Sequence, residues 1–190
     1  YQPQINIQSG ALTGVEALIR WQHPDKGVMG PKHFIQEAED TGLIIPIGEW
    51  VMHQACRDMK SWLDKGFKFG RVSVNVAGPQ LQRGDLLAVV KRALEKENLK
   101  PQYLELELTE TYAMELIQSH MQTLNDLHEM GVSIAIDDFG TGTSSLSKLK
   151  NLHIDKLKID RSFVMDIPMD KNDEAITRAI IGMSHTLGLS

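Results

Sequence analysis

Hydrophobic positions along this chain recur with two different periods, which alternate from one segment to the next. Segments in which every second residue is apolar predict strands, and segments with apolar residues three or four positions apart predict helices. Strands are predicted at residues 1–7, 15–21, 71–76, 104–108, 133–137 and 156–159, with turn residues that make the first two an antiparallel pair. Helices are predicted at residues 34–38, 47–62, 86–94, 116–130, 145–152 and 174–187. This alternation is typical of an α/β fold with a mostly parallel sheet.

Each predicted strand has one polar face and one apolar face. Because side chains alternate across a strand, residues two apart share a face. The polar faces hold Glu16, Leu18 and Arg20; Ser73 and Asn75; Glu105 and Glu107; Ala135 and Asp137; and Lys156, Lys158 and Asp160. Burying unpaired charges is costly, so these faces are expected to surround a shared polar site while the apolar faces pack under helices. A barrel with helices outside and the chemistry at one mouth has this arrangement, which favours a TIM-like barrel.

Carboxylates dominate the predicted polar site. Glu16, Glu107, Asp137 and Asp138 converge there together with Asn75. Oxygen ligands without histidine or cysteine suit hard cations such as Mg²⁺ or Mn²⁺, and the chain has no CxxC or HExxH motif that would favour zinc. Four acids exceed the need of one ion, and two ions sharing an aspartate are typical of phosphodiester hydrolysis. The alternative for the Asp-Asp pair, a turn or helix N-cap, is disfavoured by the acids on the other strands.

Composition narrows the function classes further. The chain has 190 residues, a formal net charge of −5 and a sequence pI near 5.8, so it has no general attraction for polymeric nucleic acid or an anionic membrane. The single cysteine, Cys56, cannot form an intrachain disulfide, which favours a reducing, cytoplasmic location. No apolar run approaches the length of a membrane span. The scattered histidines and the methionines at apolar helix positions are assigned no chemical role.

Several motifs together carry a family resemblance. They are "YQP" at 1–3, "EALIRW" at 16–21, "SVNVA" at 73–77, "ELTET" at 107–111, "DDFGTGTSSL" at 137–146 and "KLKIDRSFV" at 156–164. In this order they resemble the bacterial EAL domain, which hydrolyses cyclic di-GMP to linear pGpG. The resemblance extends over the whole chain. It implies a TIM-like barrel with an antiparallel first strand and a site that takes two divalent cations.

The resemblance also implies roles for individual residues. The positions matching Glu16, Asn75, Glu107 and Asp137 hold one metal ion, and Asp137 bridges to a second ion that Asp138 also binds. Lys158 matches the lysine that contacts the nucleophilic water, so Lys158, Glu16 and Asp137 form the expected catalytic set. Gln2, Leu18 and Arg20 are expected to bind substrate, with Arg20 on a phosphate. Glu110 is expected to stabilise the loop that follows Asp137.

The chain departs from the family pattern at a few places. Thr143 stands where the family usually has an aromatic or large apolar residue, and Ala77 and Thr111 replace common serines. About six of the family's eight strands are predicted, so residues 1–190 are expected to form a single EAL-type domain that is incomplete at its carboxyl end.

The expected partners are cyclic di-GMP and a second copy of the chain, with regulatory or membrane domains outside this segment. Two rival functions remain open. One is a degenerate EAL domain that binds the nucleotide or a protein without turnover, and the other is a barrel enzyme that uses divalent ions on an unrelated substrate.

Overall fold

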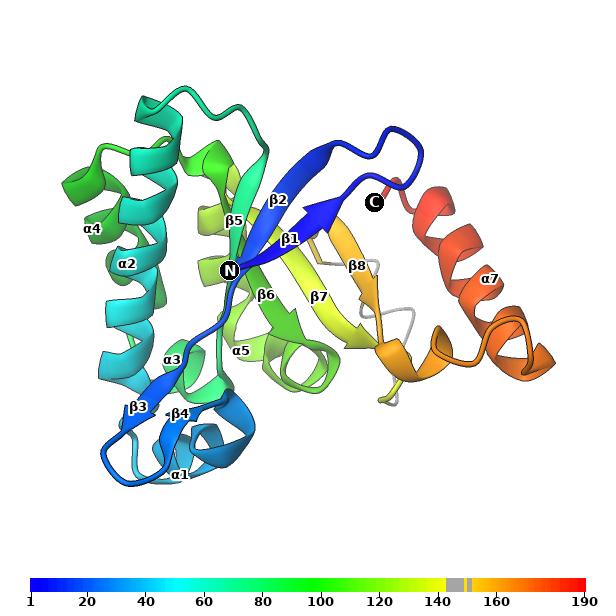
Figure 1. The fold of residues 1–190 in the computed structure, drawn as a ribbon, viewed down its shortest axis with the longest axis horizontal. Coiled ribbons are helices and arrows are strands. Elements are labelled where there is room, and N and C mark those ends of the chain that lie inside the picture. Colours follow the sequence, from blue (N-terminus) through cyan, green and yellow to red (C-terminus); the bar gives the residue numbers. More distant parts are fainter. Residues whose placement is uncertain (143–148, 150–151) are drawn as a thin grey trace.

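A computed structural model describes residues 1–142, 149 and 152–190 of the chain. Its main sheet has six strands, in the order β1-β2-β5-β6-β7-β8. They span Gln2–Ile5, Leu12–Ala17, Arg71–Asn75, Leu104–Thr109, Ser133–Phe139 and Lys156–Ile159. The first strand is antiparallel to the second, and every later pair is parallel. The sheet curls into a half-barrel with helices around it (Figure 1), which confirms the predicted α/β, TIM-like architecture and its antiparallel first strand.

Helices surround the sheet, and the longer ones bury their apolar residues in the core on its apolar face. The helices are α1 (Ile35–Asp40), α2 (Ile44–Asp64), α3 (Gly78–Arg83), α4 (Leu86–Glu97), α5 (Glu110–Glu129) and α7 (Lys171–Thr186), with single 3₁₀ turns at Pro31–His33, Pro101–Tyr103 and Arg161–Phe163. In Figure 1, α2 and α4 lie beside each other along one side, and α7 lies at the far edge beyond β8. Within the described part of the chain, no helix is long and apolar enough to cross a membrane.

Strand β6 shows how the two faces of the sheet divide. Its Leu104, Leu106 and Leu108 are buried in the core that the helices cover. Its Glu105 and Glu107, which alternate with these leucines, are equally buried but face the concave side of the half-barrel. The core therefore lies between sheet and helices, and the interior of the barrel is polar, as the sequence pattern predicted.

The region after β2 differs from the prediction. We expected one strand over residues 15–21, but β2 ends at Ala17 and Trp21–His23 (β3) forms a separate hairpin with Gly27–Met29 (β4). The guanidinium of Arg20 donates hydrogen bonds to the carbonyls of Leu18 and Ile19. These two carbonyls therefore accept from a nearby side chain instead of from a neighbouring strand. Residues 18 and 20 consequently leave the alternating pattern that placed them on the face of Glu16.

Two helices also differ from the prediction. Helix α5 begins at Glu110, six positions before the expected start, because apolar periodicity becomes clear only after its first turns. Helix α3 was not predicted; it is short, and Pro79 near its start fits the first turn of a helix. The helix expected at 145–152 and the departure at Thr143 lie outside the described residues, apart from residues 149 and 152.

Candidate active site

Four neighbouring strands bring polar side chains to the concave face at their carboxyl ends. Glu16 comes from β2, Asn75 from β5, Glu107 from β6 and Asp137 from β7. Asn75 lies opposite Glu107 in the parallel register, and its amide nitrogen donates to Glu16 Oε1 at 2.8 Å. One carboxylate oxygen from each of the three acids lies within 4.8 Å of the others. Residues far apart in the sequence are therefore gathered by strand order alone.

Lys158 of β8 lies at the centre of the three acids. Its Nζ is 2.5 Å from Glu107 Oε2, 2.8 Å from Asp137 Oδ2 and 3.3 Å from Glu16 Oε2. Burial alone would lower the pKa of this ammonium, but Glu107 and Asp137 outweigh burial and raise it. Three carboxylates around one ammonium leave two formal negative charges uncompensated when all are ionised. The cluster is therefore suited to attract further positive charge.

Glu107 provides the clearest indication that this cluster is suited to a metal ion. Its side chain is buried, and its Oε1 has no hydrogen-bond partner among the described residues. Burial raises the pKa of this carboxyl to about 7, even though Lys158 opposes the shift. A buried acceptor without a partner is costly unless something else occupies it. Oxygen ligands from Glu16, Glu107, Asp137 and Asn75 fit a hard divalent cation.

Asp138 lies beside this compact group. Its backbone adopts φ +53°, a left-handed conformation that residues other than glycine rarely adopt, and its N–H donates to Asp137 Oδ1. Burial, and then the neighbouring Asp137 and Asp160, raise the pKa of Asp138. The unusual backbone turns this second carboxyl toward a different part of the site from Asp137.

Glu110 supports the loop after β7. Its buried carboxylate accepts hydrogen bonds from the backbone N–H groups of Gly140, at 2.7 Å, and Gly142, at 3.2 Å. Gly140 has φ +105°, and a Cβ there would lie 2.8 Å from the ring of Phe163. The start of the loop that follows β7 is therefore held close to the first turn of α5.

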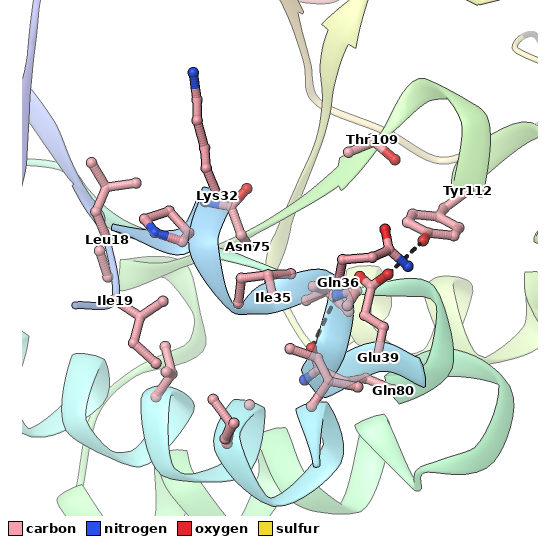
Figure 2. Close-up of a pocket in the computed structure, with 18 of the residues that line it drawn as sticks. Leu18, Ile19, Lys32, Ile35, Gln36, Glu39, Asn75, Gln80, Thr109 and Tyr112 are labelled. Carbon is pink, nitrogen blue, oxygen red and sulfur yellow. Dashed lines mark hydrogen bonds between the residues drawn. The ribbon is translucent and has the colours of Figure 1, made fainter. Parts of the chain in front are cut away.

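A pocket of about 620 Å³ opens next to the acids (Figure 2). Glu16, Asn75 and Asp138 line one part of it. The remainder is mostly apolar and lies between the end of β2, the helices α1 and α2 and the end of β5. Its walls include Leu18, Ile19, Ile35, Ile47, Val51 and Ala77, with polar groups from Lys32, Gln36, Glu39, Gln80, Thr109 and Tyr112. Such a cavity suits a flat, partly apolar ligand group whose polar end reaches the acids.

The three residues expected to bind substrate lie in different environments. Leu18 lines the pocket. Gln2 is exposed on β1 directly opposite Glu16 in the antiparallel register, at the same mouth of the half-barrel. Arg20 is also exposed, but it does not line the pocket, because its guanidinium contacts the carbonyls of Leu18 and Ile19. Leu18 and Gln2 thus lie beside the acids, whereas the guanidinium of Arg20 is engaged with carbonyls of its own segment.

A second polar layer lies deeper in the half-barrel. The buried Glu105 carboxylate accepts hydrogen bonds from Ser73 Oγ at 2.8 Å, Ser133 Oγ at 3.2 Å and Lys156 Nζ at 2.7 Å. Both of its oxygens are thus occupied by donors from the chain itself. This layer therefore resembles the Lys158 cluster in composition but offers no free ligand atom.

The sequence analysis did not find the polar groups on the outer wall of the pocket. Gln36 was placed on a short predicted helix without a role, Glu39 lay just beyond the end of that helix, and Tyr112 was expected to precede the helix in which it lies. The hairpin that precedes α1 could have been predicted from the turn sequence at residues 24–27.

The curled sheet and its acid cluster define a TIM-like barrel protein with its site at the carboxyl ends of the strands. The chain belongs to the EAL domain family, whose family model matches residues 1–190. It is 45% identical over 189 residues to MucR of Pseudomonas aeruginosa, a bifunctional diguanylate cyclase/cyclic di-GMP phosphodiesterase. It is 36% identical over 189 residues to PdeR of Escherichia coli, a cyclic di-GMP phosphodiesterase.

These matches cover the whole chain but only part of each relative. The aligned segment is 100% of this chain and 28% of both MucR and PdeR, so the chain spans about a quarter of these relatives. A solved structure of the MucR phosphodiesterase in complex with c-di-GMP matches with a TM-score of 0.95 and 45% identity. That match covers 100% of this chain and 76% of the solved chain. The family and fold predicted from the sequence are confirmed.

Proposed function

We propose that this chain is a metal-dependent phosphodiesterase that hydrolyses cyclic di-GMP to linear pGpG. The observation that carries the proposal is the acid cluster with the unpartnered, buried Glu107 Oε1, next to a pocket large enough for a nucleotide base. The relatives MucR and PdeR are named for activity on cyclic di-GMP. The acid site with its pocket and the names of the relatives therefore support the same substrate.

The residues proposed to hold divalent cations, Mg²⁺ or Mn²⁺, fall into two sets. Glu16, Asn75, Glu107 and Asp137 form the first set, and Asp137 with Asp138 forms the second. Bound divalent cations would offset the negative charge of a phosphodiester and make water more nucleophilic near neutral pH. The distinct direction of Asp138, set by its left-handed backbone, supports a second position next to the first.

The chain's own groups would complete the site. Lys158 already lies within hydrogen-bond distance of three acids, so its ammonium is proposed to give up part of these contacts and hold the attacking water. Leu18 and the apolar pocket would exclude water from one guanine base. Gln2 would contact the substrate across from Glu16, and Arg20 would leave its two carbonyl partners to bind a phosphate. Glu110 would keep Asp138 oriented through the loop that it holds.

Product chromatography tests this proposal. The protein is incubated with cyclic di-GMP in Mn²⁺ and, separately, in a chelator, and binding is measured in parallel by calorimetry. We expect pGpG to form only with the metal. Binding without turnover would instead favour the non-catalytic EAL domain, and absence of binding would reject cyclic di-GMP as the ligand.

Two wider expectations are proposals as well. We infer that residues 1–190 act as an EAL-type domain within a longer protein, because the relatives are about four times as long as the segment that matches.

A homodimer is proposed from the family resemblance, and sedimentation equilibrium at several concentrations tests it. A single mass equal to one chain at all concentrations would reject the dimer.

A further inference from the structure

One wall of the pocket is formed by a helix with few anchors of its own. Helix α1 has six residues, of which only Ala38 is buried, and its first residue follows Phe34 without a side-chain cap. Its residues Ile35, Gln36 and Glu39 line the pocket (Figure 2). The width of the pocket therefore depends on where this short helix lies.

Tyr112 connects that wall to the site strands. Its hydroxyl donates a hydrogen bond to Glu39 Oε2 at 3.1 Å, across 73 positions of sequence (dashed in Figure 2). Among the residues that the structure describes, no other side-chain hydrogen bond joins α1 to another element. Tyr112 lies in the first turn of α5, directly after the strand that carries Glu107. The hydrogen bond thus links the pocket wall to the backbone that bears a proposed metal ligand.

The backbone of α3 leaves room for the ring of Tyr112. A Cβ at Gly78, the first residue of α3, would lie 2.5 Å from Cδ1 and Cε1 of the Tyr112 ring. Real Cβ atoms do not approach ring carbons so closely, so only glycine leaves room for the ring at this point. The ring of Tyr112 therefore lies against the start of α3 while its hydroxyl reaches α1.

We propose that Tyr112 is a positioning residue that fixes α1 as the outer wall of the nucleotide pocket and so sets nucleotide affinity without acting in the chemical step. This inference rests on the proposed function for the identity of the nucleotide, cyclic di-GMP. Glu39 is the group through which Tyr112 acts, and the half-burial of both residues limits competition from water. Loss of the hydroxyl would loosen α1 while leaving the acids and Lys158 in place.

The main test compares Tyr112→Phe with the unaltered protein. The variant keeps the ring against Gly78 and removes only the hydroxyl. We expect KM and the dissociation constant for cyclic di-GMP to rise about five-fold, the size expected for one lost hydrogen bond of ordinary strength, with kcat changed less than two-fold. Tyr103→Phe is the matched control, because Tyr103 is a half-buried tyrosine at the opposite end of β6. It should leave KM unchanged.

A double-mutant cycle with Glu39 separates positioning from direct contact between Glu39 and the ligand. In the Glu39→Ala background, adding Tyr112→Phe should raise KM no further, since the hydrogen bond is already absent. Glu39→Gln keeps an acceptor oxygen and should restore part of the sensitivity to Tyr112→Phe. Additive effects of Tyr112→Phe and Glu39→Ala would overturn the inference.

Amide hydrogen exchange without nucleotide provides a readout that does not depend on the proposed substrate. Tyr112→Phe should speed exchange of the α1 amides about five-fold and leave those of β6 unchanged. Unchanged exchange at α1, unchanged KM, or a fall in kcat at constant KM would each overturn the positioning role. If the unaltered protein does not bind cyclic di-GMP, the proposed function fails, and the exchange result alone then decides whether Tyr112 positions α1.

Discussion

Replacing Lys158 by methionine should destabilise the metal-free protein strongly. The variant keeps a side chain of similar length but leaves Glu107, which is 1% exposed, without its ammonium partner at 2.5 Å. Removing one partner of a buried ion pair costs about 3–5 kcal/mol. Because Glu16 and Asp137 retain partial contact with water, we expect the lower end, about 3 kcal/mol, at pH 8.

The loss of unfolding free energy in Lys158→Met should be smaller at lower pH and in the presence of metal. Burial raises the pKa of Glu107 to about 7 although Lys158 lowers it, so loss of Lys158 raises that pKa further, and as the pH falls from 8 the carboxyl takes up a proton and no longer needs a counter-charge. The Lys158 pKa is raised above its usual value of 10.5, so the ammonium itself does not titrate in this range. Mn²⁺ should restore most of the lost stability, because it would supply the missing positive charge.

Urea unfolding in a chelator and in Mn²⁺ measures these effects. Lys156→Met is the matched control, because Lys156 lies two residues earlier on β8 and contacts a buried glutamate in the same way. Its partner Glu105 keeps donors from Ser73 and Ser133, so the destabilisation should be smaller and Mn²⁺ should not reverse it. Equal losses in the two variants, or no rescue of Lys158→Met by Mn²⁺, would refute the reasoning.

Three other results are expected. The unfolding free energy of the metal-free protein should fall by up to about 3 kcal/mol as pH rises from 4.5 to 7, because Glu107 keeps its proton to a higher pH in the folded state than in the unfolded state. An unfolding free energy that does not change over this pH range would contradict the raised pKa of Glu107. Asp138→Gly should raise the unfolding free energy by about 1 kcal/mol by relieving the left-handed backbone and should lower turnover, whereas unchanged turnover would remove Asp138 from the site. Arg20→Ala should raise the cyclic di-GMP dissociation constant about ten-fold or more without altering Mn²⁺ affinity by calorimetry, and equal nucleotide affinity would show that Arg20 only holds its local carbonyls.

The sequence predicts the sheet well because burial on one side imposes a period of two on each strand. Strand β8 has the predicted bounds, and Glu105 and Glu107 lie on the polar interior face as expected. The pattern does not distinguish the two interior layers, since both contain glutamate and lysine. Only the register of neighbouring strands gives Glu105 its serine donors and leaves Glu107 Oε1 without a partner.

The parts that could not be predicted depend on single side chains and on tertiary contacts. Strand β2 ends at Ala17, and the Arg20 guanidinium bonds the carbonyls of the next two residues, a local contact that periodicity does not encode. The pocket wall depends on Tyr112 reaching Glu39 past Gly78, three residues on three different helices. A family resemblance identifies the ligand set but gives no information on a tertiary contact of this kind.

The most direct test of the account compares two glutamates on one strand. Glu107→Gln and Glu105→Gln each replace a buried carboxylate on the interior face of β6 by its neutral isostere, two residues apart. With Mn²⁺ present, pGpG formation followed by chromatography should fall about 100-fold or more in Glu107→Gln, the loss typical for one catalytic electrostatic group. The Glu105→Gln protein should remain within a few-fold of the unaltered protein. Equal activity in Glu107→Gln and the unaltered protein would contradict the claim that this acid cluster is the catalytic metal site.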